Sequence, residues 1–177
     1  ALGSGANALA TNATAVGTDA LAAGEDASAL GTNAQATGED SVAVGSGASA
    51  SDIGASATGA GAAASGAYST ANGSESVASG QQAIASGFRS TASEAGSSAF
   101  GSYSEATGEL STALGYGSVA SNVYSTAVGA AATATGASAV AVGEFSEATG
   151  DESVAIGGST FFGFIPARAS GTGASAF

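Results

Sequence analysis

The sequence predicts an all-β protein, a flattened solenoid in which parallel strands stack in rungs of fourteen residues. Alanine recurs at every seventh position from Ala1 to Ala176, with Phe162 as the single exception. Alanine or serine stands two positions earlier in each unit, except for Thr160 before Phe162, and glycine usually stands two positions after each alanine. The unit is Gly-x-x-[Ala/Ser]-x-Ala-x, and such regularity indicates a repeat architecture.

A period of seven is also typical of a coiled coil, whose apolar a and d residues form one helical seam. Here the constant small residues lie at i and i+2, which is the alternation of a strand. One glycine per heptad would also cost a helix roughly 1 kcal/mol relative to alanine. We therefore predict a strand of about five residues in each heptad, followed by a turn at Gly-x-x.

The positions that flank each constant alanine divide the heptads into two alternating kinds. Side chains alternate across a strand, so these positions face away from the Ala/Ser pair. They are often apolar in every second heptad, as in Val42 and Val44, and mostly polar in the heptads between, as in Thr133 and Thr135. One apolar strand, one polar strand and two turns make one rung.

The turns also differ between the two kinds of strand. Glycine follows every apolar strand, from Gly3 through Gly157 and Gly171, which indicates a backbone position that needs positive φ or close approach. After the polar strand this glycine is sometimes replaced, for example by Asp52 or Glu94, with another glycine two residues later. We interpret that later glycine as a sign that the bend of the chain shifts toward it.

The outer face of the apolar strands predicts self-association. The interior holds only small side chains, which contribute far less than the roughly 1.5–3 kcal/mol of a buried Val or Leu, so a single rod should be marginally stable. A long exposed apolar stripe is typical of an interface, and we predict an obligate oligomer closed around an axis parallel to the rod. The predicted interface residues are Val16, Leu30, Val42, Val44, Phe100, Leu114, Val128, Val140, Val142, Val154 and Ile156.

Composition argues against several classes of function. Two basic residues against 14 acidic ones give a net charge of −12, which disfavours binding to nucleic acid. Without His, Cys or Lys the chain lacks the usual residues of nucleophilic triads, zinc sites and phosphate-binding loops. Glu144 and Glu147 could form a glycosidase-like pair, but acidic turn residues are too frequent for this to be specific. We predict no enzyme and no catalytic residue.

Acidic residues gather at the turns, and stacked rungs would bring Glu25 near Glu39, an arrangement that could attract Ca²⁺. We interpret them instead as a solvated surface that limits lateral aggregation, and predict neither a metal nor a cofactor. No run of about twenty apolar residues is present, so we expect no membrane insertion by this segment. Both ends fall within the repeat, which we interpret as a segment of a longer protein.

Aromatic residues in the turns are the candidates for contact with a ligand. Phe88, Tyr103, Tyr116 and Phe145 lie in the two variable positions after an apolar strand, and Arg89 stands beside the first. Interfaces favour Tyr, Phe and Arg, so these five residues are the predicted ligand-binding surface. The alternative is that the rings cover the groove between neighbouring chains, because this turn borders the predicted interface.

The repeat is one continuous array over 1–177, with an irregular rung at about 158–168. Phe162 takes an internal alanine position, Phe164 takes a glycine position, and Pro166 removes a backbone donor. We predict a distorted hydrophobic rung that packs against a neighbouring chain or domain. A binding loop is the alternative.

Several heptads share the pattern Ser-x-Ala-[Val/Leu/Ile]-Gly. It stands at 41–45, 111–115, 125–129 and 153–157. Together with the fourteen-residue spacing, this pattern resembles the head repeats of trimeric autotransporter adhesins, the YadA-like heads of Gram-negative bacteria. The resemblance covers essentially the whole chain and implies a left-handed parallel β-roll that assembles as a homotrimer.

The resemblance also implies a function. It implies a virulence-associated adhesin on the cell surface, held in the outer membrane by a C-terminal region absent here, that attaches to host extracellular matrix, cells, other bacteria or abiotic surfaces. Asp40 and Glu152 stand where collagen-binding repeats have Asn, so we leave the ligand open. The alternative is a structural spacer rod that presents another binding domain. An ice-binding solenoid would need regular Thr-x-Thr rows, which this chain lacks.

Overall fold

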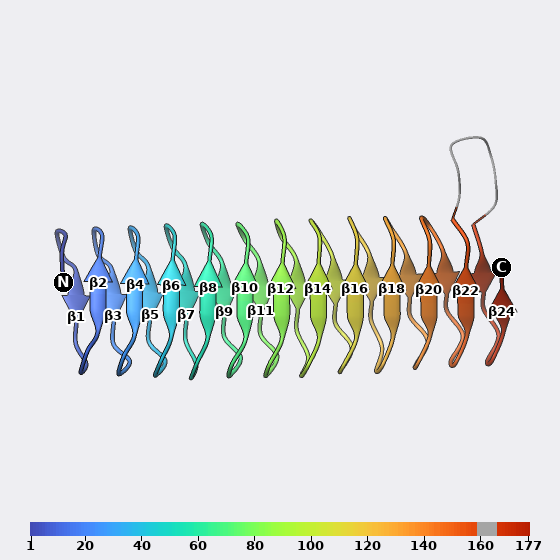
Figure 1. Cartoon of the computed structure of the whole chain (residues 1–177), viewed down its shortest axis with the longest axis horizontal. Helices are drawn as coiled ribbons and strands as arrows, with labels where there is room; N and C mark the ends of the chain where they lie inside the picture. Colours follow the sequence, from blue (N-terminus) through green and yellow to red (C-terminus); the bar gives the residue numbers. More distant parts are fainter. Residues whose placement is uncertain (159–165) are drawn as a thin grey trace.

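The computed structural model describes residues 1–158 and 166–177 and shows an elongated rod of stacked rungs (Figure 1). The chain alternates between two twelve-stranded parallel sheets and crosses from one to the other at every turn. We call them sheet A, with the even-numbered strands, and sheet B, with the odd-numbered strands. Within the described part of the chain, no helix has the length and apolar character needed to cross a membrane.

The strands of both sheets are short and follow the heptad. Sheet A consists of β2 (Thr14–Val16), β4 (Ser28–Leu30), β6 (Val42–Val44), β8 (Ser56–Thr58), β10 (Thr70–Asn72), β12 (Ile84–Ser86), β14 (Ser98–Phe100), β16 (Thr112–Leu114), β18 (Thr126–Val128), β20 (Val140–Val142), β22 (Val154–Ile156) and β24 (Ser175–Ala176). Sheet B consists of β1 (Asn7–Ala8), β3 (Leu21–Ala22), β5 (Gln35–Ala36), β7 (Ser49–Ala50), β9 (Ala63–Ala64), β11 (Val77–Ala78), β13 (Thr91–Ala92), β15 (Glu105–Ala106), β17 (Val119–Ala120), β19 (Thr133–Ala134), β21 (Glu147–Ala148) and β23 (Arg168–Ala169).

The register aligns equivalent positions of successive rungs. In sheet A, Ala113 pairs with Ala127, and Thr112 pairs with Thr126. The constant alanines therefore form an unbroken column along each sheet. The predicted fold class, an all-β parallel solenoid with fourteen-residue rungs and two short strands per rung, is confirmed.

The strands have two or three residues, so the expected length of about five was wrong. The first small residue of each heptad explains the difference. The N–H of Ala20 donates to the carbonyl of Gly17 at 3.3 Å and closes the turn, and only its carbonyl joins the sheet, where it accepts from Asn7 at 2.8 Å. Half of the hydrogen-bonding capacity of that residue therefore belongs to the turn.

The core is the thin layer of small side chains between the two sheets. The constant alanines from Ala15 to Ala155 have no exposed surface. Three buried serines at the first small position, Ser69, Ser111 and Ser153, have no hydrogen-bond partner for their hydroxyl among the described residues. At the other buried ones, serine can replace alanine because its hydroxyl reaches a turn carbonyl: Ser41 Oγ donates to Gly38 at 2.6 Å, for example. Burial of that hydroxyl is thus compensated by a hydrogen bond.

The turns that follow sheet A strands, which we call A-turns, require glycine at their first position. Gly45 has φ +131°, and a Cβ there would lie 2.5 Å from the carbonyl oxygen of Gly59 in the next rung. Both predicted reasons for this glycine, positive φ and close approach, are confirmed.

The turns after sheet B strands, the B-turns, are less strict. Gly38 does not have a positive φ, and only close approach to the next rung favours glycine there. The interpreted shift of the bend at Asp52 was wrong. Gly54 has φ +62°, where the preceding rung has Asp40 at +56°, so the turn keeps its place and only its left-handed residue changes.

The strand pairing changes near the C-terminus. Ala155 pairs with Ala176, and Glu147 pairs with Arg168, one heptad beyond the fourteen-residue spacing of the preceding rungs. Gly171 therefore follows a strand of sheet B, and its assignment to an apolar strand was wrong. The extra heptad keeps the seven-residue frame but exchanges the two sheets.

The predicted distorted rung at 158–168 falls largely outside the described residues, as do its aromatic residues Phe162 and Phe164.

Candidate functional site

The described part of the chain contains no pocket, and the side chains on its outer surfaces vary from rung to rung. It also contains no group of three or more acidic side chains placed to hold a metal ion. The surfaces that differ from rung to rung are therefore the candidates. They are the two turn edges and the outward face of sheet A.

Three rings on consecutive A-turns form a row in which each ring contacts the next. Phe88 and Tyr116 occupy the position after the turn glycine, and Tyr103 occupies the next, left-handed position. The ring centroids of Phe88 and Tyr103 are 5.3 Å apart, and those of Tyr103 and Tyr116 are 5.8 Å apart, both edge to face. We call these three residues the aromatic row. All three remain exposed, Tyr116 most of all at 65%.

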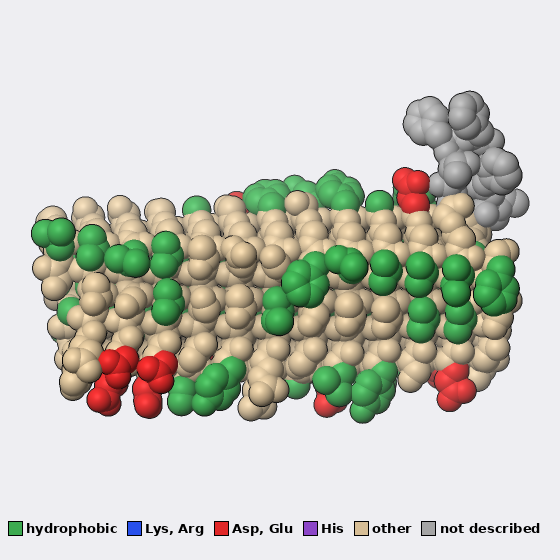
Figure 2. Space-filling view, viewed as in Figure 1, with side chains coloured by type: hydrophobic (Ala, Val, Ile, Leu, Met, Phe, Trp, Pro, Cys, Tyr) green, Lys and Arg blue, Asp and Glu red, His purple; other side chains and the backbone are tan. Residues whose placement is uncertain are grey.

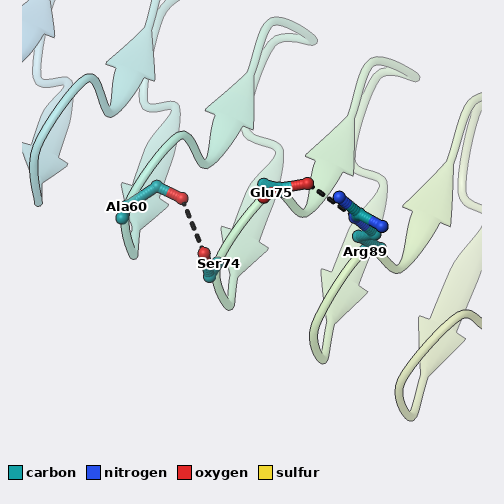
Figure 3. A network of polar contacts seen from close by, with 4 residues as sticks. All are labelled: Ala60, Ser74, Glu75 and Arg89. Carbon is teal, nitrogen blue, oxygen red and sulfur yellow. Dashed lines mark hydrogen bonds and ion pairs between the residues drawn. The ribbon is translucent and has the colours of Figure 1, made fainter.

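Arg89 extends the aromatic row toward the N-terminus. Its guanidinium carbon lies 5.0 Å from the ring centroid of Phe88, within the range of a cation–π contact. Its Nε donates to Oε2 of Glu75 in the preceding rung at 2.6 Å (Figure 3). This hydrogen bond raises the pKa of Arg89 above its usual range, and the negative charge of the carboxylate adds to the effect. Ser74 Oγ continues the line and donates to the carbonyl of Ala60 at 3.1 Å.

Phe145 lies on the same edge but stands apart from the aromatic row. The A-turn between Tyr116 and Phe145 carries only Ala130 and Ala131 at its variable positions. No ring contact involves Phe145 among the described residues, and half of its surface is exposed. The structure therefore brings together four of the five predicted ligand-binding residues.

The backbone conformation at this edge is costly for bulky side chains. Tyr103 and Phe145 both have φ +59°, and Arg89 has φ +55°. A residue with a Cβ in this region costs roughly 1–2 kcal/mol, and Asn tolerates it better, as at Asn33 in an equivalent turn. Turn geometry therefore does not explain the aromatic side chains. Such departures from local preference are typical of functional positions.

Sequence reasoning missed a second set of exposed residues on the B-turns. Tyr68, Leu110 and Tyr124 also have left-handed backbones and are exposed by 57%, 49% and 58%. The available signal was their position, because each stands where other B-turns have Asp or Asn, as at Asp26. Position-by-position comparison of the turns would have found them.

The predicted interface residues all lie on the outward face of sheet A, which Figure 2 shows as rows of hydrophobic side chains along the rod. Within residues 1–158 and 166–177, no strand of sheet A carries a charged residue, whereas sheet B carries Glu105, Glu147 and Arg168. The most exposed of the predicted set are Leu30, Val42, Phe100, Leu114 and Ile156, and the other six are half-buried by their neighbours.

The family model of the YadA head domain repeat (two copies) matches residues 1–20, 22–48, 78–104, 106–132 and 134–160. No curated protein matches the sequence. A solved crystal structure, the collagen-binding domain of the Yersinia adhesin YadA, is 28% identical over 80% of this chain and 63% of that one, with a TM-score of 0.38.

The present chain thus spans less than two thirds of that Yersinia domain. The family model, in contrast, matches far more than half of the sequence, in segments that follow the rungs. The resemblance found in the Ser-x-Ala-[Val/Leu/Ile]-Gly heptads is therefore confirmed. The chain belongs to the family of YadA head domain repeats.

Proposed function

We propose that this chain forms part of the head of a bacterial surface adhesin, which attaches the cell to host matrix, host cells or other surfaces by non-covalent contact. Membership of the YadA head repeat family supports this function. The observation that carries it is the aromatic row, because exposed Phe and Tyr rings beside an Arg have the composition of binding hot spots. The absence of a pocket in the described residues agrees with binding to an extended surface.

The working unit in this proposal is a homotrimer that associates through sheet A. Copies with a net charge of −12 repel one another, and the uncharged face of sheet A is where they can approach most closely. The apolar rows on that face gain from burial. The number three follows from the family resemblance, as does attachment to the outer membrane of a Gram-negative cell by a region outside this chain.

Association through sheet A leaves the turn edges and sheet B for a ligand. The aromatic row lies on the A-turn edge, between the outward faces of the two sheets, so its rings stay accessible beside the interface. The Yersinia relative is described as a collagen-binding domain. For this chain we propose binding to a matrix or cell-surface protein, or to an abiotic surface, through the aromatic row and Arg89.

The test is a binding screen of the assembled protein against matrix proteins, glycans, whole cells and plastic. The row variant combines Phe88→Ser, Tyr103→Asn and Tyr116→Ser, which introduces residue types that other A-turns carry at the same positions. The expected result is at least a tenfold loss of binding with the rod intact. The matched control, Tyr68→Asn with Tyr124→Asn, removes two rings from the opposite edge and should retain binding.

A spacer rod is the second candidate, supported by the uniformity of the rungs. In that case the chain lifts another binding domain away from the cell and the rings only cover the groove between copies. The two functions predict different binding by the isolated assembly. If the isolated assembly binds none of the targets and a longer protein that includes it does, the spacer function is correct and the adhesin function is wrong.

A further inference from the structure

The outward face of sheet A is interrupted by polar residues near the middle of the rod. The residue after each constant alanine of sheet A is apolar up to Val44 and again from Phe100 onward. Between them stand Thr58, Asn72 and Ser86, on the consecutive strands β8, β10 and β12, with Thr58 paired to Asn72 and Asn72 paired to Ser86. Figure 2 shows this break in the row of hydrophobic side chains.

These polar side chains have unused hydrogen-bonding capacity. Thr58 and Asn72 are exposed, Ser86 is half-buried, and none of the three side chains makes a hydrogen bond to any other described residue. An Asn amide offers two donors and one acceptor oxygen. By contrast, the amide of Asn122 donates to the carbonyl of Thr135 at 3.2 Å.

The interruption overlaps a stretch of the chain that the family model does not match. The family model matches residues 22–48 and resumes at 78–104, leaving 49–77 unmatched. That gap contains two of the three polar residues, Thr58 and Asn72. Ser86 lies within the matched segment 78–104.

The axial register between copies is weakly determined in an assembly of nearly identical rungs. Sliding one copy past another by one rung, about 4.8 Å, replaces each apolar contact by a similar one. A continuous apolar stripe therefore specifies register weakly, as in any strand interface without distinct side chains. A polar residue in an apolar seam is the device that fixes register in coiled coils.

We propose that Thr58, Asn72 and Ser86 form a polar segment that fixes the axial register of the copies, and this inference rests on the proposed association through sheet A. In register, each polar residue faces the same residue of the other copies. These facing side chains can form hydrogen bonds to one another or hold water between them.

A slip by one rung removes this match at both ends of the segment. It places Val44 against Thr58 and Ser86 against Phe100. The buried hydroxyl groups then face side chains that cannot bond to them, which is unfavourable. The penalty repeats in every copy, so the aligned state is selected even though the apolar contacts are nearly unchanged.

The experiment measures register by disulfide trapping, which is possible because the chain has no cysteine. Copies with Leu114→Cys and copies with Val128→Cys are unfolded, mixed, refolded together and oxidised. Disulfides between like copies report the aligned state, and mixed disulfides report a slip of one rung, because disulfide formation requires short Cβ separations. Mass spectrometry gives the ratio of mixed to like disulfides, and sedimentation gives the size of the assembly.

The register variant combines Thr58→Val, Asn72→Leu and Ser86→Val in both cysteine backgrounds. We expect the ratio of mixed to like disulfides to rise at least fivefold while the mass of the assembly is unchanged. The matched control places the same types of change on the outer side of sheet B, with Ser51→Val, Ser65→Leu and Ser93→Val, and should leave the ratio unchanged.

Each other outcome overturns the inference. An unchanged ratio in the register variant means that the polar segment does not set register. An oligomeric parent without any disulfide means that the copies do not meet through this row of sheet A. A monomeric parent contradicts the proposed association itself, and sedimentation separates that failure from the other two.

Discussion

The rings of Phe88 and Tyr103 meet edge to face across two neighbouring rungs, with their centroids 5.3 Å apart. They come from different positions of successive A-turns, the first after the glycine and the second in the left-handed position. A periodic backbone thus builds a non-periodic cluster by changing only the side chains at its turns. Contacts between the rings offset part of the energetic cost of the left-handed backbone at Tyr103.

The two left-handed tyrosines should therefore respond differently to removal. Tyr124 has φ +56° and makes no ring contact among the described residues, so Tyr124→Asn should raise the free energy of unfolding by about 1 kcal/mol. Tyr103→Asn relieves the same strain but loses two ring contacts of about 0.5–1.5 kcal/mol each, and should leave the free energy of unfolding unchanged or lower it by up to about 2 kcal/mol. Chemical denaturation at one fixed chain concentration measures both. Equal effects would show that the ring contacts contribute nothing.

A single A-turn offers a matched test of the two glycine positions. Gly45 has φ +131° and faces the carbonyl of Gly59, whereas a Cβ on Gly47, at φ +67°, would have no atom within 4 Å. Gly45→Ala combines strain with a backbone clash and should destabilise the rod by about 3 kcal/mol or more. Gly47→Ala adds only left-handed strain, about 1 kcal/mol. Thermal unfolding of both variants checks the difference, and comparable losses would contradict the assigned turn geometry.

The sequence predicted the rod because its constant residues are those that the backbone constrains. Ala15 must be small because the two sheets approach closely, and Gly17 must be glycine because its φ is +132°. Both constraints recur in each regular rung, so they are visible in one sequence. The strand length was predicted less well, because the hydrogen bond of Ala20 within the turn has no counterpart in residue type.

The other features of the fold and of the candidate site depend on contacts between rungs, which the sequence of a single heptad does not show. The frame of seven continues past Gly157, so the exchange of sheets between Ala155 and Ala169 is invisible until strands are paired. At the candidate site, residue type identified Phe88 and Tyr103 but not which rings touch. Phe145 is also an aromatic residue in an A-turn, but the intervening A-turn, which carries only alanine at its variable positions, separates it from the aromatic row.

The internal serines divide into satisfied and unsatisfied hydroxyl groups, which gives opposite expectations for the same substitution. Ser104 Oγ donates to the carbonyl of Gly101 at 2.8 Å, whereas Ser111 Oγ is buried without a partner among the residues that the structure describes. Ser104→Ala should cost about 1 kcal/mol, and Ser111→Ala should stabilise the rod by about the same amount. Urea denaturation of the two variants is sufficient. A loss of stability in Ser111→Ala would imply a hydrogen bond that the structure does not show.

Neighbouring strands of sheets A and B present two chemically different outward faces. Val142 lies on the outward face of sheet A and Thr135 follows the strand β19 of sheet B, so the same carboxylate can be placed on either face. Val142→Asp would bury one charge per copy in the apolar interface without a partner, and removal of each charge from water costs several kcal/mol. The assembly should dissociate or unfold at micromolar concentrations.

Thr135→Asp is the matched control, because its carboxylate stays in water on a surface that already carries Glu147 in the adjacent strand. It should leave the sedimentation coefficient unchanged and the free energy of unfolding within about 0.5 kcal/mol of the parent. If Val142→Asp sediments like the parent while Thr135→Asp dissociates, association proceeds through sheet B. If neither variant dissociates and the parent is monomeric, the rod is stable alone, and the argument from its thin alanine core is wrong.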